Sequence, residues 1–203
     1  MTWREKREMR EIKAEKKAER LRISGRKTDR IVNLLKKEGA AKVKVIPAGE
    51  IVIDERVRFK CQVPLCDSYG RNLLCPPNLP SVAQFRLIVA GYEKAVLVQV
   101  ISALKPSDDP FAPARKLHEI INAGEREAFL SGFPFAAGLI GGCCRLCRTC
   151  VAARSGRACR HPFQARPSME AMGIDVLSTA ANAGLPVIFP AEGSVTWTGL
   201  ILL

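Results

Sequence analysis

The sequence predicts a single mixed-sheet layered domain of the α/β or α+β class, with cysteine-rich loops and a basic N-terminal extension. A chain of 203 residues, 47% of them hydrophobic, can bury one good core. Segments with helical apolar spacing alternate with apolar runs of strand length, but strands also occur as adjacent pairs. Eight cysteines gather in two groups between these elements. We expect the basic extension to cover 1–27 and the domain that contains both cysteine groups to cover 28–203.

Half of the net charge of +12 lies in the first thirty residues, which hold twelve Lys or Arg and six Asp or Glu. Ser24–Gly25 predicts a break, after which Thr28 or Asp29 caps a short helix that ends at Gly39. The extension is either a solvated charged helix or tail, or an arm that docks onto nucleic acid or an acidic protein. The near absence of aromatic residues in it argues against nucleic acid.

The elements of the domain follow from periodicity and capping signals. Ser81 predicts the N-cap of a helix after Pro80, and Asp175 predicts the N-cap of a later one. The run "EKAVLVQVIS" has the length and β-branched content of a buried strand. In chain order we expect two strands within 41–59, a helix in 81–92, a strand in 93–102, a long helix in 108–133, a short strand in 135–142, helical pieces in 166–173 and 174–186, and strands in 186–190 and 194–203.

The downstream cysteine group has the spacing of an iron–sulfur loop. Cys144, Cys147 and Cys150 recur every three residues, and Cys159 follows. A C-x2-C-x2-C run lets one short loop reach three irons of a cubane, as in bacterial ferredoxins. Zinc ribbons use two separated C-x2-C pairs instead. We therefore expect these four cysteines to hold a first 4Fe-4S cluster, with zinc as the alternative and His161 as a possible replacement for Cys159.

The upstream group consists of Cys61, Cys66 and Cys75, and a Cys-Pro step at Cys75 resembles the one that closes ferredoxin runs. These three thiols predict a second site whose fourth position is open or filled by Cys143. A single site shared by both groups is the alternative. Because loops at equivalent ends of strands meet in layered folds, we expect both groups at one end of the sheet.

The surroundings of the downstream group are basic. Between Cys143 and Met169 there are six arginines and no Asp or Glu. This field would favour the reduced state of an anionic cluster, attract an acidic redox partner or a small anionic substrate, or form a solvated face. Glu170 favours a helix N-terminus, with Ser168 as N-cap and Gly173 as the turn, rather than a catalytic role.

Two further side chains, Tyr69 and His118, lie outside the cysteine pattern. Tyr69 is either a hydrogen-bond donor to a cluster sulfur or an ordinary turn residue beside Gly70. His118 lies in the middle of a predicted helix with no cysteine near it in the sequence, so we expect a structural role.

Three motifs resemble those of a known family: C-x4-C-x2-YG-x4-CPP, CRLCRTC…CRHP and RPSMEAMGIDV. They are similar to a prokaryotic family of unknown function that is described as predicted metal-binding proteins. The resemblance extends from about Val45 to the C-terminus and does not include Cys143 or the basic extension. It implies no activity, but it implies a metal or iron–sulfur site built from Cys61, Cys66, Cys75, Cys144, Cys147, Cys150 and Cys159.

The predicted function is therefore redox chemistry. The chain shows no signal peptide and no apolar membrane span, so we expect a cytoplasmic protein with reduced thiols. It would carry one or two 4Fe-4S clusters and transfer electrons to an unidentified partner or substrate. The alternative is a zinc-binding structural or interaction protein with a basic partner-binding surface. No Walker loop, Rossmann fingerprint or Ser/His/Asp arrangement assigns an enzyme class.

Overall fold

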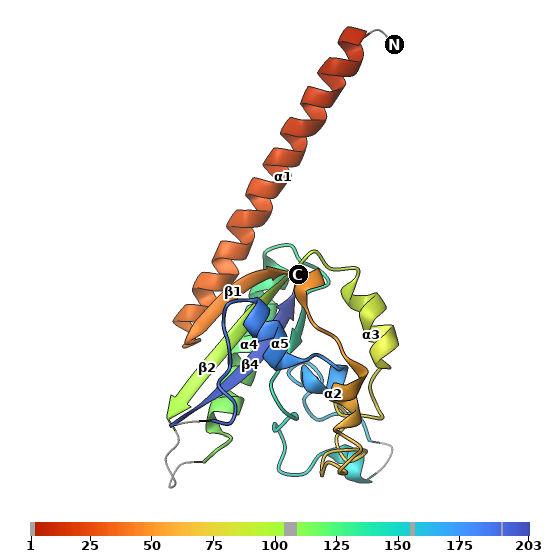
Figure 1. Cartoon of the computed structure of the whole chain (residues 1–203), viewed down its shortest axis with the longest axis vertical. Coiled ribbons are helices and arrows are strands. Elements are labelled where there is room, and N and C mark those ends of the chain that lie inside the picture. Colours follow the sequence, from red (N-terminus) through yellow and green to blue (C-terminus); the bar gives the residue numbers. More distant parts are fainter. Residues whose placement is uncertain (1–2, 104–108, 155–156, 192) are drawn as a thin grey trace.

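The computed structural model describes residues 3–103, 109–154, 157–191 and 193–203. Four strands form one open sheet in the order β1-β2-β4-β3, and every neighbouring pair is antiparallel. The expected mixed class is confirmed in its α+β form, because the helices pack on this antiparallel sheet (Figure 1). The strands are β1 (Lys42–Pro47), β2 (Lys94–Ala103), β3 (Ala137–Leu139) and β4 (Ser194–Leu202).

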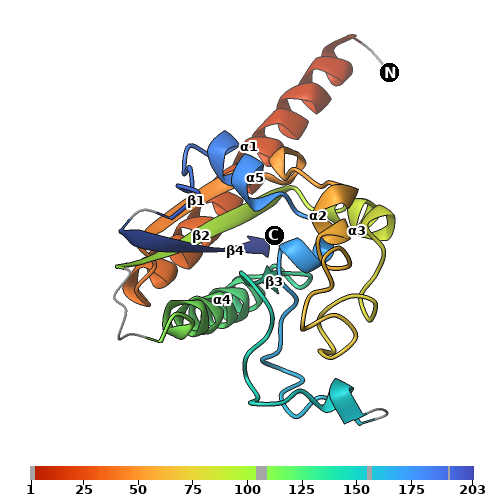
Figure 2. The same cartoon turned by 60° about the horizontal axis from the view of Figure 1, so that its bottom comes forward.

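Both faces of the sheet are buried, which explains the continuous apolar run of β2. Leu97 and Leu200 are paired across β2 and β4 and point to the face covered by α3 (Val82–Val89) and α5 (Val176–Asn182). Val98 and Ile201 point to the opposite face, where α1 (Trp3–Lys37) and α4 (Ala112–Leu130) pack. The sheet is therefore the middle one of three layers, with helices on both of its faces, as Figure 2 shows. No described helix has the length and apolar character needed to cross a bilayer.

The capping signals are confirmed where they predicted helices. The Ser81 hydroxyl accepts a hydrogen bond from Gln84 N, and the Gln84 side chain accepts one from Ser81 N, so the two form a capping box. Asp175 Oδ1 accepts a hydrogen bond from Ser178 N at the start of α5. Gly39 ends α1 with φ of 101°, a left-handed conformation that favours glycine.

The predicted break at Ser24–Gly25 is wrong, because α1 is one helix of 35 residues. A single glycine costs a helix only about 1 kcal/mol, and the Lys, Arg, Glu and Ala residues around it favour helix. Ile31 and Leu35, both fully buried, hold the C-terminal part of α1 against α4. The N-terminal part extends away from the domain (Figure 1). The domain boundary at 27 and 28 stays a prediction.

The second strand expected within 41–59 is also wrong. After β1 the chain forms a 3-10 turn, η1 (Ala48–Glu50), and then the short helix α2 (Glu55–Phe59). Asp54 causes the change, since its side chain accepts a hydrogen bond from Arg56 N and starts the helix. Ile53 keeps one isolated bridge to Ile174.

Near the C-terminus two expectations need correction. The piece expected in 166–173 is only a 3-10 turn, η3 (Glu170–Met172), in which Ser168 Oγ accepts from Ala171 N and Gly173 turns the chain with φ of 84°. The segment 186–190 is not a strand. Prolines at both of its ends lack the N–H that a ladder needs, and Ile188 and Phe189 are exposed.

Candidate metal centre

The downstream cysteine loop leaves the sheet through two glycines at the end of β3. A Cβ at Gly141 would lie 2.8 Å from Thr198 O, and one at Gly142 would lie 3.0 Å from the Trp197 ring. Gly142 also has φ of 70°, so both its backbone conformation and the space around it favour glycine. The chain thus turns tightly against β4 and enters the cysteine run directly.

The four cysteines expected to hold the first cluster lie around one small cavity of about 20 Å³. The His161 side chain lines it as well, beside residues of the upstream loop. All eight cysteines are free thiols. The members of the cavity wall that carry sulfur are Cys144, Cys147, Cys150 and Cys159.

Main-chain N–H groups point at three of these four sulfur atoms. Leu73 N lies 3.5 Å from Cys150 Sγ, and His161 N lies 3.4 Å from Cys159 Sγ. At Cys144, burial raises the pKa of the thiol, while a main-chain hydrogen bond from Leu146 lowers it. N–H donors form stronger hydrogen bonds with a charged sulfur than with a neutral one, so these groups would favour metal-bound sulfur in this loop.

The upstream thiols and Cys143 are close enough for Cys143 to affect the pKa of Cys75. Burial raises the pKa of Cys75 to about 12, and the next largest cause is the nearby thiol of Cys143, followed by Cys66 and Cys61. The pKa of Cys61 is raised by burial, then by Cys66 and by Glu170. Cys143 therefore lies near the upstream group, although in sequence it adjoins the downstream one.

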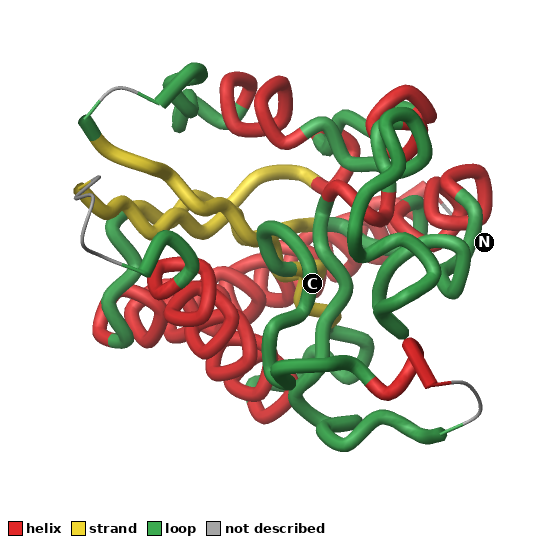
Figure 3. Tube along the Cα trace, turned by 90° about the horizontal axis from the view of Figure 1, so that it is seen from below, coloured by secondary structure: helices red, strands yellow, loops and turns green. Residues whose placement is uncertain are grey.

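The two cysteine segments contact each other directly, as expected from the sequence. Asn72, which is buried, donates a hydrogen bond from Nδ2 to Cys144 O at 3.0 Å, and Leu73 N approaches Cys150 Sγ. Figure 3 shows the two loops side by side at one end of the molecule. No sequence motif marks either residue, because each contact has a main-chain group on one side, Cys144 O for Asn72 and the N–H of Leu73 for Cys150.

No three His, Cys, Asp or Glu side chains in the described ranges converge closely enough to hold one metal ion. The ligand assignments, including those of Cys143 and His161, therefore stay predictions. The four downstream thiols line one cavity, and main-chain N–H groups approach Cys150 and Cys159.

The arginines near the cysteines divide into two kinds. Arg166 forms a half-buried ion pair with Glu125, with Nε–Oε2 of 2.5 Å. Arg160 donates to Thr149 O, and the guanidinium of Arg145 stacks on the Phe111 ring, 3.5 Å from its centroid. Arg148 and Arg157 are exposed. Some of this positive charge thus holds the loop together, and some faces solvent. The Arg154 side chain lies outside the described residues.

Two residues singled out in the sequence have structural partners. His118 Nε2 lies 2.8 Å from Gln164 O, which ties the end of the cysteine loop to α4. Burial lowers the pKa of His118, so the neutral ring is favoured there. The Tyr69 hydroxyl accepts a hydrogen bond from Gln62 Nε2 at 2.9 Å. The structural role expected for His118 agrees with this contact.

Glu170 lies in the first turn of η3, in keeping with the helix N-terminus expected for it, and it also contacts the start of the cysteine loop. Its carboxyl group accepts a hydrogen bond from Gly142 N, at 3.3 Å and 3.4 Å from its two oxygens, 28 residues away in the chain. Burial raises the pKa of Glu170 above its usual range. The residue therefore joins η3 to the start of the cysteine loop, near Cys61.

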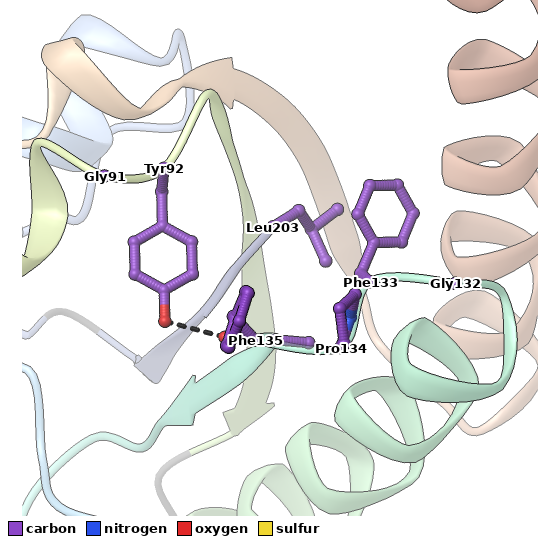
Figure 4. A pocket seen from close by; sticks show the side chains of 8 residues that line it. Gly91, Tyr92, Gly132, Phe133, Pro134, Phe135 and Leu203 are labelled. Atoms are coloured by element: carbon purple, nitrogen blue, oxygen red, sulfur yellow. Dashed lines mark hydrogen bonds between the residues drawn. The ribbon is translucent and has the colours of Figure 1, made fainter.

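A separate apolar cavity of about 380 Å³ lies at the other end of β3, away from the cysteine loop. Tyr92, Phe133, Phe135 and Leu203 surround it, and the Tyr92 hydroxyl donates to Phe135 O at 2.6 Å (Figure 4). Because β3 separates it from the thiols, this cavity is not part of the candidate metal centre.

Fold and site together define a cysteine-rich α+β protein with a candidate metal centre at one end of an antiparallel sheet. The chain belongs to the family of predicted metal-binding proteins called DUF2284, whose model matches residues 44–203. The resemblance from about Val45 onward is thereby confirmed. No curated protein and no solved structure matches the chain.

Proposed function

We propose that this predicted metal-binding protein is an iron–sulfur protein that transfers electrons. Cys144, Cys147, Cys150 and Cys159 would hold one 4Fe-4S cluster. Such a cluster supplies reversible one-electron transfer, with a potential set by its charge, its solvent exposure and the hydrogen bonds to its sulfurs.

The observation that carries the proposal is the set of main-chain N–H groups directed at Cys144, Cys150 and Cys159. Hydrogen bonds to an ionised acceptor are stronger than those to a neutral one, so this arrangement suits thiolate ligands. Together with the C-x2-C-x2-C spacing, it supports a cluster in the cavity that these cysteines line.

Cys61, Cys66 and Cys75 would hold a second cluster, with Cys143 at its fourth position. The support is the proximity of Cys143 to Cys75, which is the largest neighbour effect on the pKa of that buried thiol. A thiol with a pKa of about 12 stays protonated at neutral pH, and a bound metal would displace that proton.

The contact between the two loops provides a short path between the proposed clusters. The Leu73 N–H connects the upstream loop to Cys150, and Asn72 connects it to the main chain of Cys144. The exposed Arg148 and Arg157 would attract an acidic redox partner. Electrons would then pass between that partner and the upstream site.

Purification without air tests the proposal. The protein should be brown and contain about eight iron and eight acid-labile sulfide per chain if both sites hold cubanes, and about four if one does. A colourless protein with one or two zinc ions per chain would show that the metal is structural, and the electron-transfer function would then be wrong.

A further inference from the structure

A groove of about 450 Å³ lies between α4 and the end of the cysteine loop. Two exposed phenylalanines line it: Phe129, on α4, is 61% exposed, and Phe163, on the loop, is 89% exposed. Single apolar side chains are common on protein surfaces, but two exposed aromatic rings around one hollow are typical of an interaction site.

The groove adjoins the apolar cavity of Figure 4, because Ala136 lines both of them. In that cavity Phe135 is exposed as well. The two hollows together therefore present three exposed phenylalanines on one connected surface. Proteins rarely leave a connected apolar surface of this kind in water unless something binds there.

The turn that carries Phe163 is fixed against α4. His118 Nε2 lies 2.8 Å from Gln164 O, and Asn122 Nδ2 donates to the same oxygen at 3.0 Å. Within the turn, Gln164 N donates to His161 O at 3.1 Å. Phe163 is thus held in its exposed place by the bonds of its neighbours, so the groove is formed before any partner arrives.

The same turn separates the groove from the candidate cluster. His161 and Ala165 line the cavity of the four downstream cysteines, whereas Phe163 and Gln164 line the groove. A protein bound in the groove would therefore lie one turn of main chain away from the proposed cluster. An electron-transfer partner has to approach the cluster in this way.

The charges of the groove favour an acidic partner. Among its lining residues the carboxylate of Glu125 is already bound, by the Arg166 guanidinium and by Gly138 N. Arg126 is exposed on the same wall and has no ion pair or hydrogen bond within the part of the chain that the structure describes. The groove thus combines an uncompensated positive charge with exposed rings, and the net charge of +12 attracts acidic proteins from a distance.

We infer that this groove is the docking site of an acidic electron-transfer protein, which places an apolar side chain between Phe129 and Phe163 and a carboxylate on Arg126. The inference deepens the proposed function and rests on it for the redox role of the partner, whereas the contact itself depends only on the groove. One electron would pass from the reduced centre of the partner to the downstream cluster, so the partner is oxidised and the cluster reduced by one electron each, and no bond forms or breaks. The rings border a hollow instead of forming a flat or helical apolar face, so a protein side chain suits the groove better than a lipid surface does.

The probe is a plant-type 2Fe-2S ferredoxin, an acidic protein that carries one electron. Calorimetry at low ionic strength should show saturable binding of this ferredoxin to the anaerobically purified protein. Phe163→Ala should weaken the binding at least about tenfold, because a central aromatic contact is lost. Arg126→Glu should weaken it by at least about as much and should also reduce its dependence on salt. Both side chains are exposed, so both variants should fold like the wild type.

Two matched variants control for the loss of a ring and for the change of charge. Phe189→Ala removes a phenylalanine that is 78% exposed and lies beside α5, the helix on the other face of the sheet. Lys44→Glu, at an exposed position of β1, changes the net charge as much as Arg126→Glu does. Both controls should keep the affinity within about twofold. Dithionite, a small reductant, should reduce the cluster equally fast in every variant, whereas reduced ferredoxin should react more slowly with Phe163→Ala and Arg126→Glu.

The outcomes distinguish the docking site from the iron–sulfur proposal. A protein with its full iron content that shows no saturable binding of ferredoxin would overturn the docking inference and leave the iron–sulfur proposal standing. A zinc-only protein whose ferredoxin binding depends on Phe163 and Arg126 would support the groove as a protein-binding site and overturn its redox role.

Two further outcomes would contradict the inference. Ferredoxin binding that neither Phe163→Ala nor Arg126→Glu weakens would place the partner on another surface. If ferredoxin does not bind, but Phe163→Ala abolishes either self-association or binding to vesicles of equal parts phosphatidylcholine and phosphatidylglycerol, the groove would belong to a second copy of the chain or to a lipid surface instead.

Discussion

Leu73 and Cys150, 77 residues apart in the chain, are joined by a hydrogen bond from the Leu73 N–H to the Cys150 sulfur at 3.5 Å. This contact makes the upstream loop part of the environment of the downstream thiols. It predicts that changes in one cysteine segment are measurable in the other.

Replacing Leu73 with proline removes the N–H and should lower the reduction potential of the downstream cluster. N–H donors stabilise the more negative, reduced state, so their loss favours oxidation. Redox titration of the anaerobic protein measures the shift. Leu73→Ala keeps the N–H and is the control, so an equal shift in both variants would mean that side-chain packing, not the hydrogen bond, sets the potential.

Cys147→Ser should remove the iron of one whole cluster, about half of the total, and leave the fold intact. Cys147 is central in the tightest cysteine run, and the further thiol in the described part of that loop, Cys143, is assigned to the upstream site. Iron analysis and circular dichroism check this. Thr149→Ser, at an exposed position of the same loop, should keep all the iron; wild-type iron in Cys147→Ser would refute the assignment of the first site.

Changing Cys61, Cys66 and Cys75 together to alanine should keep roughly half the iron, with the spectrum of a complete four-thiolate cubane. Cys143→Ala alone should affect the same upstream cluster, because its thiol lies beside Cys75. Electron paramagnetic resonance of the reduced proteins distinguishes the clusters. Complete loss of iron in the triple variant would indicate one shared site, and unchanged iron would make the upstream thiols structural.

Deleting residues 1–27 should preserve folding and metal content, because the deleted part contains no cysteine and the buried Ile31 and Leu35 remain. Deleting residues 1–36 should destabilise the domain by several kcal/mol, since each of those two side chains contributes about 2–5 kcal/mol on truncation. Thermal melts of both proteins compare the effects. A large destabilisation by the shorter deletion would place the domain boundary nearer the N-terminus.

The unfolding free energy should fall as the pH drops below about 6.5, in part through His118. Burial lowers the pKa of His118 in the folded state, so the unfolded chain binds the proton more tightly, and protonation favours unfolding. The contribution is at most about 1.4 kcal/mol per pH unit below the unfolded pKa. Denaturant unfolding at pH 5 to 8 measures the slope, which His118→Gln should reduce; an unchanged slope would exclude this histidine as the cause.

The sequence by itself determined the regular elements with strong local signals. The apolar run of β2, the N-caps at Ser81 and Asp175 and the left-handed Gly39 each depend on a few neighbouring residues, and all are present in the structure. The cysteine spacing and the three motifs were sufficient to identify the family, whose model matches residues 44–203.

Tertiary structure decided the elements whose local signals conflict. The segment after β1 alternates like a strand, yet the hydrogen bond from Arg56 N to Asp54 and the packing of α2 on η3 make it helical. Gly25 predicts a helix break, but α1 continues through it. The free-energy cost of one glycine in a helix is small, and the helix-favouring neighbours of Gly25 and the packing of Ile31 and Leu35 offset it.

Only the tertiary structure brought Cys143 to the upstream thiols, the Leu73 N–H to Cys150, and Glu170 to Gly142. Each of these contacts joins residues from 28 to 77 positions apart through main-chain groups or burial. Main-chain groups are present at every residue and form no motif, and burial depends on the packing of distant segments. The residue types at the site could therefore be read from the sequence, while their electrostatic environment depended on the fold.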